Sequence, residues 1–428
     1  MIRFVRRLPG GIHYAWLVVA VVFLTQLAGA GMRATPSVLI VPWEQAFGWS
    51  RGTISLAISV NLLLFGLLGP FAAALMQRIG VRRTVLGALI LLDLAVGASF
   101  FMSEPWQLVL TWGFLVGLGG GTVAVAFGAT VVNRWFVTRR GLAIGIVTAA
   151  NAAGQLVFLP ILASVATSDG WRPTVLVATL ALAAVIPLIA LFLPERPADV
   201  GVRPYGDKGE REEERAIPAN PLVIAFSALG RGVKSGNFWL LFASFMVCGA
   251  SANGLVGTHL ISYCFDNGIP EVAAAGLLAG MGAFNIVGTT LSGWLSDRFD
   301  NRVLLMFFYG LRGLSLLYLP FSDFGFGTLS IFALFYGLDW IATVAPTLRL
   351  ITDNFGKQDA PVIFGWVFAG HQLGAGGVAF LAGVLRADLG TYLAPFMISG
   401  TLCLMAAVFV LWIGSFGRGR LEPVPVAG

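Results

Sequence analysis

Long apolar segments dominate this sequence and constrain its fold more than any other feature. A helix needs about 20 mostly apolar residues to cross the hydrocarbon core of a bilayer. Segments that meet this requirement lie at about 14–41, 53–76, 84–102, 106–132, 142–167, 173–193, 238–262, 272–295, 303–321, 327–349, 361–385 and 391–415. A water-soluble core does not hold so many, so the sequence predicts an all-α polytopic membrane protein with twelve transmembrane helices.

The composition excludes several other classes of protein. Of the 428 residues, 57% are apolar and 11% are charged, whereas about 25% of the residues in a soluble domain are charged. A cytosolic enzyme and a disordered chain are both excluded. Cys248, Cys264 and Cys403 are too far apart for a metal site or a disulfide framework, so we interpret them as small buried side chains. Three scattered histidines predict neither an enzyme nor a cofactor or metal site.

The basic residues are distributed unevenly between the loops. When the loops are assigned alternately to two sides of a membrane, 22 of the 27 basic residues fall on the side that holds both termini. Arg51, Arg172 and Arg386 fall on the opposite side, and Arg33 and Arg312 lie inside apolar segments. The positive-inside rule therefore predicts that both termini are cytoplasmic. It also explains the net charge of +6 without a nucleic-acid partner.

A polar stretch and an internal repeat divide the chain. The stretch 194–236 separates six apolar segments from six others, so we expect six-helix bundles at 1–193 and 237–428 joined by a solvated cytoplasmic linker. Gly145 recurs 220 positions later as Gly365, at the same place in its segment. Two pseudo-symmetric bundles follow. Carriers built from such repeats hold their substrate near the midplane, where the halves meet.

A glycine-rich basic loop follows the eighth segment. Its sequence, Gly293-Trp-Leu-Ser-Asp-Arg-Phe-Asp-Asn-Arg302, resembles the G-x-L-x-D-R-x-x-x-R signature of the major facilitator superfamily. The resemblance implies the major facilitator fold, in which charged loop residues hold neighbouring helix ends in one conformational state. The residues that would do so here are Arg78, Asp297, Arg298 and Arg302. Gln77 replaces the usual acid in the first-half copy, and the alternative is that these loops only set the topology.

Four motifs of the first half resemble a narrower group, the monocarboxylate transporters and oxalate/formate antiporters. They are Tyr14-Ala15-Trp16, the segment 47–52 (FGWSRG), the segment 134–143 that begins Arg-Trp-Phe, and Gly170-Trp171-Arg172. The likeness covers about residues 12–195 well and the second half in outline. It implies a secondary active transporter of the inner membrane that moves a small organic anion, a monocarboxylate, together with a proton.

The predicted anion specificity depends on Arg33. The monocarboxylate family carries a lysine in the outer half of the first span that receives the substrate carboxylate, and Arg33 stands at that position. A guanidinium that faces water inside the bundle can bind a carboxylate through two parallel hydrogen bonds. The alternative is an arginine that extends to the outer membrane surface.

The family also carries an aspartate and an arginine, four residues apart in the eighth span, that handle the proton and the anion. When the loop motif is used to place them, these positions are Asn285 and Thr289. The charged pair is therefore absent from its usual helix, and the coupling residues must lie elsewhere.

Three ionisable residues of the second half lie near the middle of predicted spans. Such a residue costs about 2.5 to 3.5 kcal/mol at a helix centre, which makes it a candidate for function. Arg312 and Asp339 lie on successive antiparallel spans and can pair. We predict that Asp339 and His371 carry protons, with Arg312 as a second cation or as the structural partner of Asp339. A purely structural ion pair and a neutral, hydrogen-bonded imidazole are the alternatives.

Uncharged polar side chains inside the spans are the remaining candidates. They can orient a small solute, or they can form hydrogen bonds between helices. In addition to Arg33, the predicted substrate-binding set is Gln26, Asn151, Asn253, Tyr336, His371 and Gln372. Asp93 lies on a span that is expected to be peripheral, so we predict a structural role for it.

Together these predictions define a monomeric carrier in a lipid bilayer. The glycine-rich stretches lie inside apolar segments and lack the Gly-Lys-Ser/Thr ending of a phosphate-binding loop, so transport would be driven by gradients. Two alternatives stay open. An exporter of hydrophobic or cationic compounds is one, although the stretch 110–117 lacks the arginine typical of drug/proton antiporters. A non-transporting sensor of the same fold is the other, although the linker of about 43 residues is short for a signalling domain.

Overall fold

The protein is almost entirely helical over the residues that the computed structural model describes, 13–123, 125–207 and 221–415. These residues form no β-sheet, and Phe136 and Tyr205 pair as an isolated bridge. Helices satisfy their backbone hydrogen bonds internally, as the apolar interior of a bilayer requires. The predicted all-α membrane fold is confirmed.

The described residues of the first half form nine α-helices. They are α1 (Tyr14–Phe47), α2 (Arg51–Leu67), α3 (Gly69–Ile79), α4 (Val81–Ala98), α5 (Pro105–Leu108), α6 (Val116–Val123), α7 (Val125–Trp135), α8 (Arg140–Asp169) and α9 (Trp171–Phe192). A π-helical segment, Val109–Leu115, connects α5 to α6. The described residues of the second half form α10 (Pro221–Gly232), α11 (Gly236–Gly249), α12 (Gly257–Asp266), α13 (Glu271–Ser296), α14 (Asn301–Tyr318), α15 (Phe326–Asp339), α16 (Val344–Leu389) and α17 (Leu393–Phe409). The backbone of Gly356 is not helical (φ 81°), so α16 consists of two helices that meet there and belong to successive spans. A second π-helical segment, Ala250–Val256, connects α11 to α12.

Eleven helical segments among the described residues are long and apolar enough to cross a membrane. The twelfth predicted segment, 53–76, is divided at Leu68 between α2 and α3. Pro70 lies in the first turn of α3 and has no N–H to bond to the preceding turn, which accounts for the division. The predicted segment 327–349 is also discontinuous, because α15 ends at Asp339 and α16 begins at Val344.

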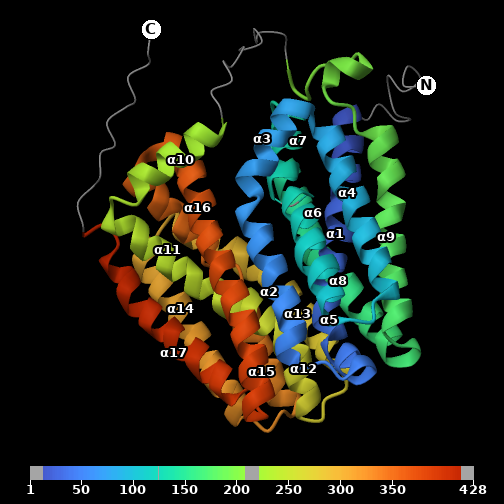
Figure 1. Ribbon diagram of the computed structural model, residues 1–428. Coiled ribbons are helices and arrows are strands. Elements are labelled where there is room, and N and C mark those ends of the chain that lie inside the picture. Colours follow the sequence, from blue (N-terminus) through green and yellow to red (C-terminus); the bar gives the residue numbers. More distant parts are fainter. Residues whose placement is uncertain (1–12, 124, 208–220, 416–428) are drawn as a thin grey trace.

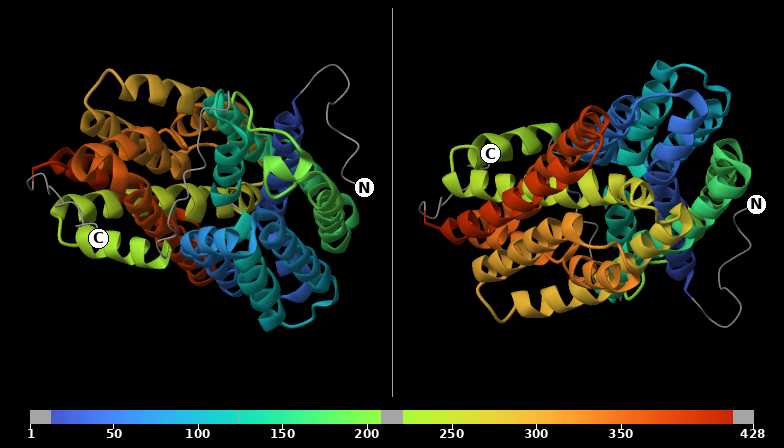
Figure 2. Two further views of the ribbon diagram at one scale, coloured as in Figure 1. Left: turned by 90° about the horizontal axis from the view of Figure 1, so that it is seen from above. Right: turned by 90° about the horizontal axis from the view of Figure 1, so that it is seen from below.

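The helices form two groups that lie side by side, α1 to α9 and α10 to α17 (Figures 1 and 2). The main contacts between the groups join α2 to α16, α8 to α13 and α1 to α12. We call the end at which α1 begins the terminal end, and the end at which α1 meets α2 the far end. The two groups converge at the far end and diverge toward the terminal end, which is at the top of Figure 1.

The segment predicted as a solvated linker, 194–236, is partly folded. Residues 208–220, which hold many of its charges, lie outside the described residues, but its last part forms α10, which packs on α16. Arg231 pairs with Asp359 at 2.8 Å, and the indole N–H of Trp366 donates to the carbonyl of Ala225. The last part of the predicted linker is therefore not solvated on all sides, because α10 packs on the middle of α16, near Asp359 and Trp366.

Glycines let α13 and α15 approach closely beside the discontinuity in the second half. A Cβ atom added to Gly288 would lie 1.7 Å from the carbonyl oxygen of Leu338. A Cβ added to Gly337 would lie 2.9 Å from the carbonyl oxygen of Met281. Small residues permit this kind of backbone contact between membrane helices.

The variant Gly288→Ala is therefore expected to be less stable by about 3 kcal/mol, because the added methyl group forces the two helix backbones apart. Gly282→Ala on the same helix is the matched control, since a Cβ there meets nothing within 4 Å. The measurement is the unfolding of detergent-solubilised protein by SDS, followed by circular dichroism. Equal loss of stability in both variants would contradict this account of the contact.

Candidate functional site

Arg33 lies on α1, where its half-buried side chain reaches two other helices of the first half. Its guanidinium donates to the side-chain oxygen of Asn151 on α8 at 2.5 Å. It also lies 5.4 Å from the ring centroid of Phe65 on α2. Gly29, one turn earlier on α1, leaves room for the guanidinium to fold back along the helix. The structure thus brings together two predicted substrate-binding residues, Arg33 and Asn151.

The charge of Arg33 has no acidic partner in the part of the chain that the structure describes. Among the described residues, no carboxylate lies within ion-pair distance of its guanidinium. The two fully buried arginines differ, because Arg312 pairs with Asp339 and Arg51 pairs with Glu44 and Asp266. A cation inside a membrane protein whose partners are an amide oxygen and an aromatic ring attracts an anion. Arg33 therefore has the chemistry of an anion site.

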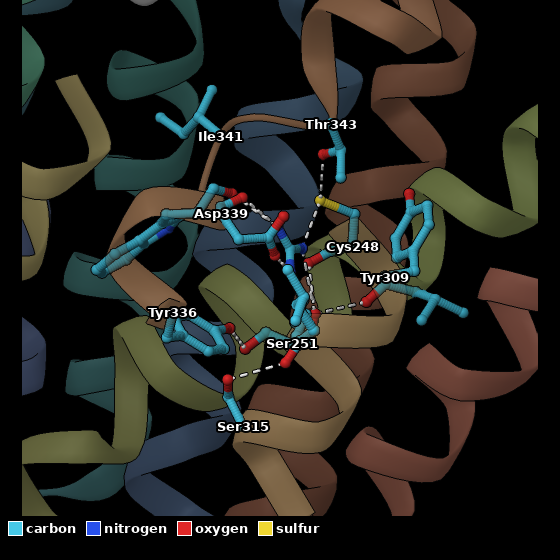
Figure 3. Close-up of polar contacts among 12 residues, drawn as sticks. Cys248, Ser251, Tyr309, Ser315, Tyr336, Asp339, Ile341 and Thr343 are labelled. Atoms are coloured by element: carbon cyan, nitrogen blue, oxygen red, sulfur yellow. Dashed lines mark hydrogen bonds and ion pairs between the residues drawn. The ribbon is translucent and has the colours of Figure 1, made fainter. Parts of the chain in front are cut away.

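A buried ion pair lies in the second half (Figure 3). The Nε atom of Arg312 on α14 donates to Asp339 at the end of α15 at 2.5 Å, and both side chains are buried. The pairing expected from their positions on successive spans is present. The guanidinium also donates to the Sγ atom of Cys248 on α11 at 2.9 Å. Cys248 in turn lies 3.2 Å from the hydroxyl of Thr343.

Arg312 also stabilises the discontinuity between α15 and α16. A helix end leaves carbonyl groups without partners, and these are costly inside a membrane. The Nη2 atom of Arg312 donates to the backbone carbonyls of Asp339 at 2.7 Å and Trp340 at 3.0 Å. The hydroxyl of Ser292 on α13 donates to the carbonyl of Ala342. The broken helix is thus satisfied by side chains from neighbouring helices.

Asn285 and Thr289 take part in the same arrangement. These are the positions at which the resembling family carries its charged pair. The side-chain oxygen of Asn285 accepts from the backbone N–H of Ile341 at 3.1 Å and from the hydroxyl of Thr289 at 3.0 Å. The eighth span therefore supports the broken tenth span through neutral groups, and the second-half ion pair lies on α14 and α15.

Three of the predicted substrate-binding and proton-coupling residues keep a buried polar atom without a hydrogen-bond partner among the described residues. These atoms are Oδ1 of Asp339, Nδ1 of His371 and Oε1 of Gln372. The imidazole of His371 stacks on Phe368 and lies 4.9 Å from the ring of Phe245. Gln372 packs on Gly66 of α2, where the two halves meet. Unsatisfied buried atoms of this kind are uncommon and are found at functional sites.

Other predicted polar residues form bonds within the helix groups. Tyr336 is fully buried, and its hydroxyl donates to the carbonyl of Ser251 at 2.9 Å. Asn253 is half-buried in the π-helical segment Ala250–Val256, and its backbone carbonyl accepts from Thr258. Gln26 is buried beside Gly128 of α7. The hydrogen bond of Tyr336 joins two helices, which is the role that the sequence allowed as the alternative to contact with a solute.

The loop residues predicted to control conformation are not joined to one another. Arg298 donates to the carbonyl of Trp294, Arg302 pairs with Asp300 at 2.6 Å, and Arg78 and Asp297 are exposed. Sequence reasoning missed the acid that acts at the corresponding place in the first half, which is described next.

Glu195, just after α9, holds the terminal end of the first half together. Its carboxylate accepts from the backbone N–H groups of Val81 at 2.7 Å and Arg82 at 3.0 Å, and from Arg134 at 2.5 Å. Partial burial opposes ionisation, but these hydrogen bonds outweigh it and hold the pKa of Glu195 below its usual value. Glu195 thus places a negative charge at the start of α4, next to its free N–H groups. The first-half loop motif has no acid of its own there, because Gln77 replaces it.

The far end carries a charged cluster that the sequence did not reveal. Arg51 bonds both carboxylate oxygens of Asp266, and Arg386 bonds the same carboxylate. His259 on α12 is buried and hydrogen-bonded to Tyr392. The sequence shows opposite charges at the ends of separate spans, which can form ion pairs. It does not show which of these ends lie next to one another.

The fold and these buried charges are those of a membrane carrier, and the chain belongs to the Major Facilitator Superfamily, whose family model matches residues 21–375. The predicted class, a transporter rather than an enzyme, is confirmed.

Among curated proteins, the chain is 28% identical to "Uncharacterized MFS-type transporter YcxA" of Bacillus subtilis, over 95% of each chain. It is 25% identical to Monocarboxylate transporter 13 of Rattus norvegicus, over 94% of this chain and 90% of the relative. It is 27% identical to Monocarboxylate transporter 11 of Homo sapiens, over 91% and 81%. The resemblance to the monocarboxylate transporters is confirmed.

Solved structures of the same fold include a bacterial homologue of the human lysosomal transporter Spinster in an inward-facing, occupied conformation. It superposes with a TM-score of 0.74 at 14% identity, over 94% of this chain and 97% of the other. A POT family transporter in complex with 5-aminolevulinic acid gives a TM-score of 0.71 at 14% identity, over 94% and 97%. These likenesses show the fold alone.

Proposed function

We propose that the protein moves a small monocarboxylate, together with a proton, across the inner membrane by alternating access. The observation that carries this proposal is the un-neutralised guanidinium of Arg33, held on Asn151 beside the ring of Phe65. One free cation matches one carboxylate. A dicarboxylate would leave its second charge without a partner of this kind. The monocarboxylate transporters among the relatives support the same substrate class.

Asn151 fixes the position of the guanidinium in this proposal. Its side-chain oxygen takes one of the N–H groups of Arg33, which leaves the others for a carboxylate. Phe65 gives an apolar wall on which the carbon skeleton of the substrate rests. His371 and Gln372, with unpartnered atoms on α16, would contact the substrate from the second half.

Asp339 is the proposed proton carrier. One of its oxygens accepts from Arg312, while the other is buried without a partner among the described residues and is free to take a proton. Protonation would weaken the pair with Arg312 and loosen the link between α15 and the rest of the second half. A proton bound at Asp339 would thus favour a different arrangement of the broken helix.

The terminal end would face the cytoplasm, as the basic loops of that side indicate. The two groups of helices diverge there and converge at the far end (Figure 1). Rocking of one group against the other would close the terminal end and open the far end.

The test is uptake into proteoliposomes. We expect an imposed inward proton gradient to drive accumulation of small monocarboxylates, while the corresponding amides are not taken up. Asp339→Asn should reduce gradient-driven accumulation to the level seen without a gradient, yet keep exchange of internal for external carboxylate, because only the proton step is lost. Accumulation of organic cations without carboxylates would contradict the proposal and favour an exporter.

A further inference from the structure

The far end joins the two halves through one buried arginine. Arg51, the first residue of α2, donates from Nη1 and Nη2 to the two carboxylate oxygens of Asp266, each at 2.7 Å. The side chain of Arg51 is only 4% exposed. Paired hydrogen bonds between a guanidinium and a carboxylate are strong and directional. Asp266 ends α12, so this contact links the first half to the second.

Each member of this pair has a second partner in its own half. The Nε atom of Arg51 donates to Glu44 of α1 at 2.8 Å, and Arg386 of α16 donates to Asp266 at 2.7 Å. The Glu44–Arg51 contact is local, because the two residues flank the tight turn between α1 and α2. Gly48 in that turn has a left-handed backbone (φ 68°), and its N–H bonds the carbonyl of Glu44. Both within-half pairs would survive a rigid-body movement of the halves.

A hydrogen-bonded chain in the second half completes the cluster. The Nε2 atom of His259 faces the carbonyl of Ala379 at 2.8 Å, so Nε2 carries the proton and donates. Nδ1 then accepts from the hydroxyl of Tyr392 at 3.0 Å. The oxygen of Tyr392 is left to accept from Arg51 at 3.3 Å. The buried imidazole thus orients the tyrosine toward the arginine of the other half.

Close backbone packing lies directly beneath the cluster. A Cβ added to Gly383 of α16 would lie 2.2 Å from the hydroxyl oxygen of Ser55 on α2, and Ser55 is fully buried. Further toward the midplane, Gly376 packs on Leu63 in the same way. Ser55 therefore becomes accessible to a reagent from solution only when the far end opens.

We propose that this cluster is a latch with built-in replacement counter-ions. Closing the far end adds the Arg51–Asp266 pair; opening it leaves Arg51 with Glu44 and Asp266 with Arg386. Neither Arg51 nor Asp266 is left without an opposite charge in either state, so the latch opens without the large cost of an unpaired ion. The inference rests on the proposed alternating access, but it assigns to Glu44 and Arg386 a role that no contact with substrate requires.

Removing the latch and removing a replacement counter-ion therefore have opposite effects. Asp266→Asn weakens the closed state, because the charged bond between the halves is lost. Glu44→Gln leaves the closed state its Arg51–Asp266 pair but strands Arg51 when the far end opens. Arg386→Gln strands Asp266 in the same way. The last two variants should open less often than the parent protein.

The experiment measures the rate at which a thiol reagent labels a cysteine at position 55, using Ser55→Cys in the full-length, detergent-solubilised protein. Relative to Ser55→Cys alone, we expect Asp266→Asn to raise the labelling rate about tenfold, and Glu44→Gln and Arg386→Gln each to lower it about tenfold. Protein without Ser55→Cys gives the background from the three native cysteines, which are buried. Glu104→Gln and Arg172→Gln, charged far-end residues outside the cluster, are the matched controls and should change nothing.

Two results would overturn the latch: an unchanged rate in Asp266→Asn, or a rise in rate in Glu44→Gln or Arg386→Gln. Labelling needs no substrate, so failure of the latch is distinguishable from failure of the proposed function. Opposite shifts in a protein that transports no carboxylate would support the latch and reject the proposed substrate. Carboxylate uptake with no shift in the labelling rate would support the proposed substrate and reject the latch.

Discussion

Arg33→Gln is expected to lower carboxylate uptake in proteoliposomes by about 100-fold. Glutamine keeps a side chain that can bond Asn151, but it removes the charge that attracts the anion. Loss of one member of a buried charged pair costs about 2.7 kcal/mol or more, which corresponds to this factor. The measurement is the initial rate of uptake at a fixed proton gradient, with the amount of folded protein determined by size-exclusion chromatography.

Arg33→Lys and Asn151→Ala separate charge from position. Lysine keeps the charge but not the planar fork, so we expect Arg33→Lys to retain part of the activity. Asn151→Ala leaves the charge and removes the group that holds it, so its main effect should be a raised KM. Normal carboxylate uptake by Arg33→Gln would exclude Arg33 as the anion site.

Arg312→Met is expected to cost about 3 to 5 kcal/mol of stability, the largest structural effect that we predict for a single substitution. The change leaves the Asp339 carboxylate buried without its cation. It also removes the donors to the carbonyls of Asp339 and Trp340, which lie where α15 is interrupted. Unfolding by SDS, followed by circular dichroism, measures the loss.

The double variant Arg312→Met with Asp339→Leu gives the control. It removes the stranded charge, so it should recover part of the lost stability. Recovery should be incomplete, because the carbonyl of Trp340 has lost its Arg312 donor and the carbonyl of Asp339 keeps only the N–H of Ala342. If the double variant is no more stable than Arg312→Met, the ion pair is not what makes the single substitution costly.

The sequence predicted the helices well because a bilayer leaves a chain few alternatives. Apolar length alone located the spans, and the charges between them set the expected topology. It also placed Arg312 and Asp339 on helices that meet. These features depend on local composition or on neighbouring segments, both of which can be read along a single chain.

Contacts between distant segments could not be predicted in this way. The hydrogen bond of Arg33 to Asn151 joins residues 118 positions apart, and that of Arg51 to Asp266 joins residues 215 positions apart. Pro346, in the first turn of α16, has no N–H for the preceding turn and marks the interruption of the tenth span in the sequence, but the sequence does not show what satisfies the freed backbone groups. The interruption persists because Arg312, Asn285 and Ser292, on other helices, satisfy the freed backbone groups.

Polar residues were the hardest to interpret, because one residue type serves two purposes inside a membrane protein. Tyr336 was predicted to contact substrate, and in the structure its buried hydroxyl donates to the backbone carbonyl of Ser251. Gln372 and His371 keep an unpartnered atom, which a sequence does not distinguish from a paired one. The difference lies in what the neighbouring helix presents, and that depends on the packing of the whole half.

The central claim is that Arg33 offers an unpaired positive charge to a carboxylate. Its most direct test is a thermal-shift titration of detergent-solubilised protein with small monocarboxylates and their matched amides, because a ligand that binds only the folded protein raises its melting temperature. We predict a rise of Tm with at least one carboxylate, none with its amide, and none with either compound in Arg33→Gln. An equal rise in the parent protein and in Arg33→Gln would contradict the claim.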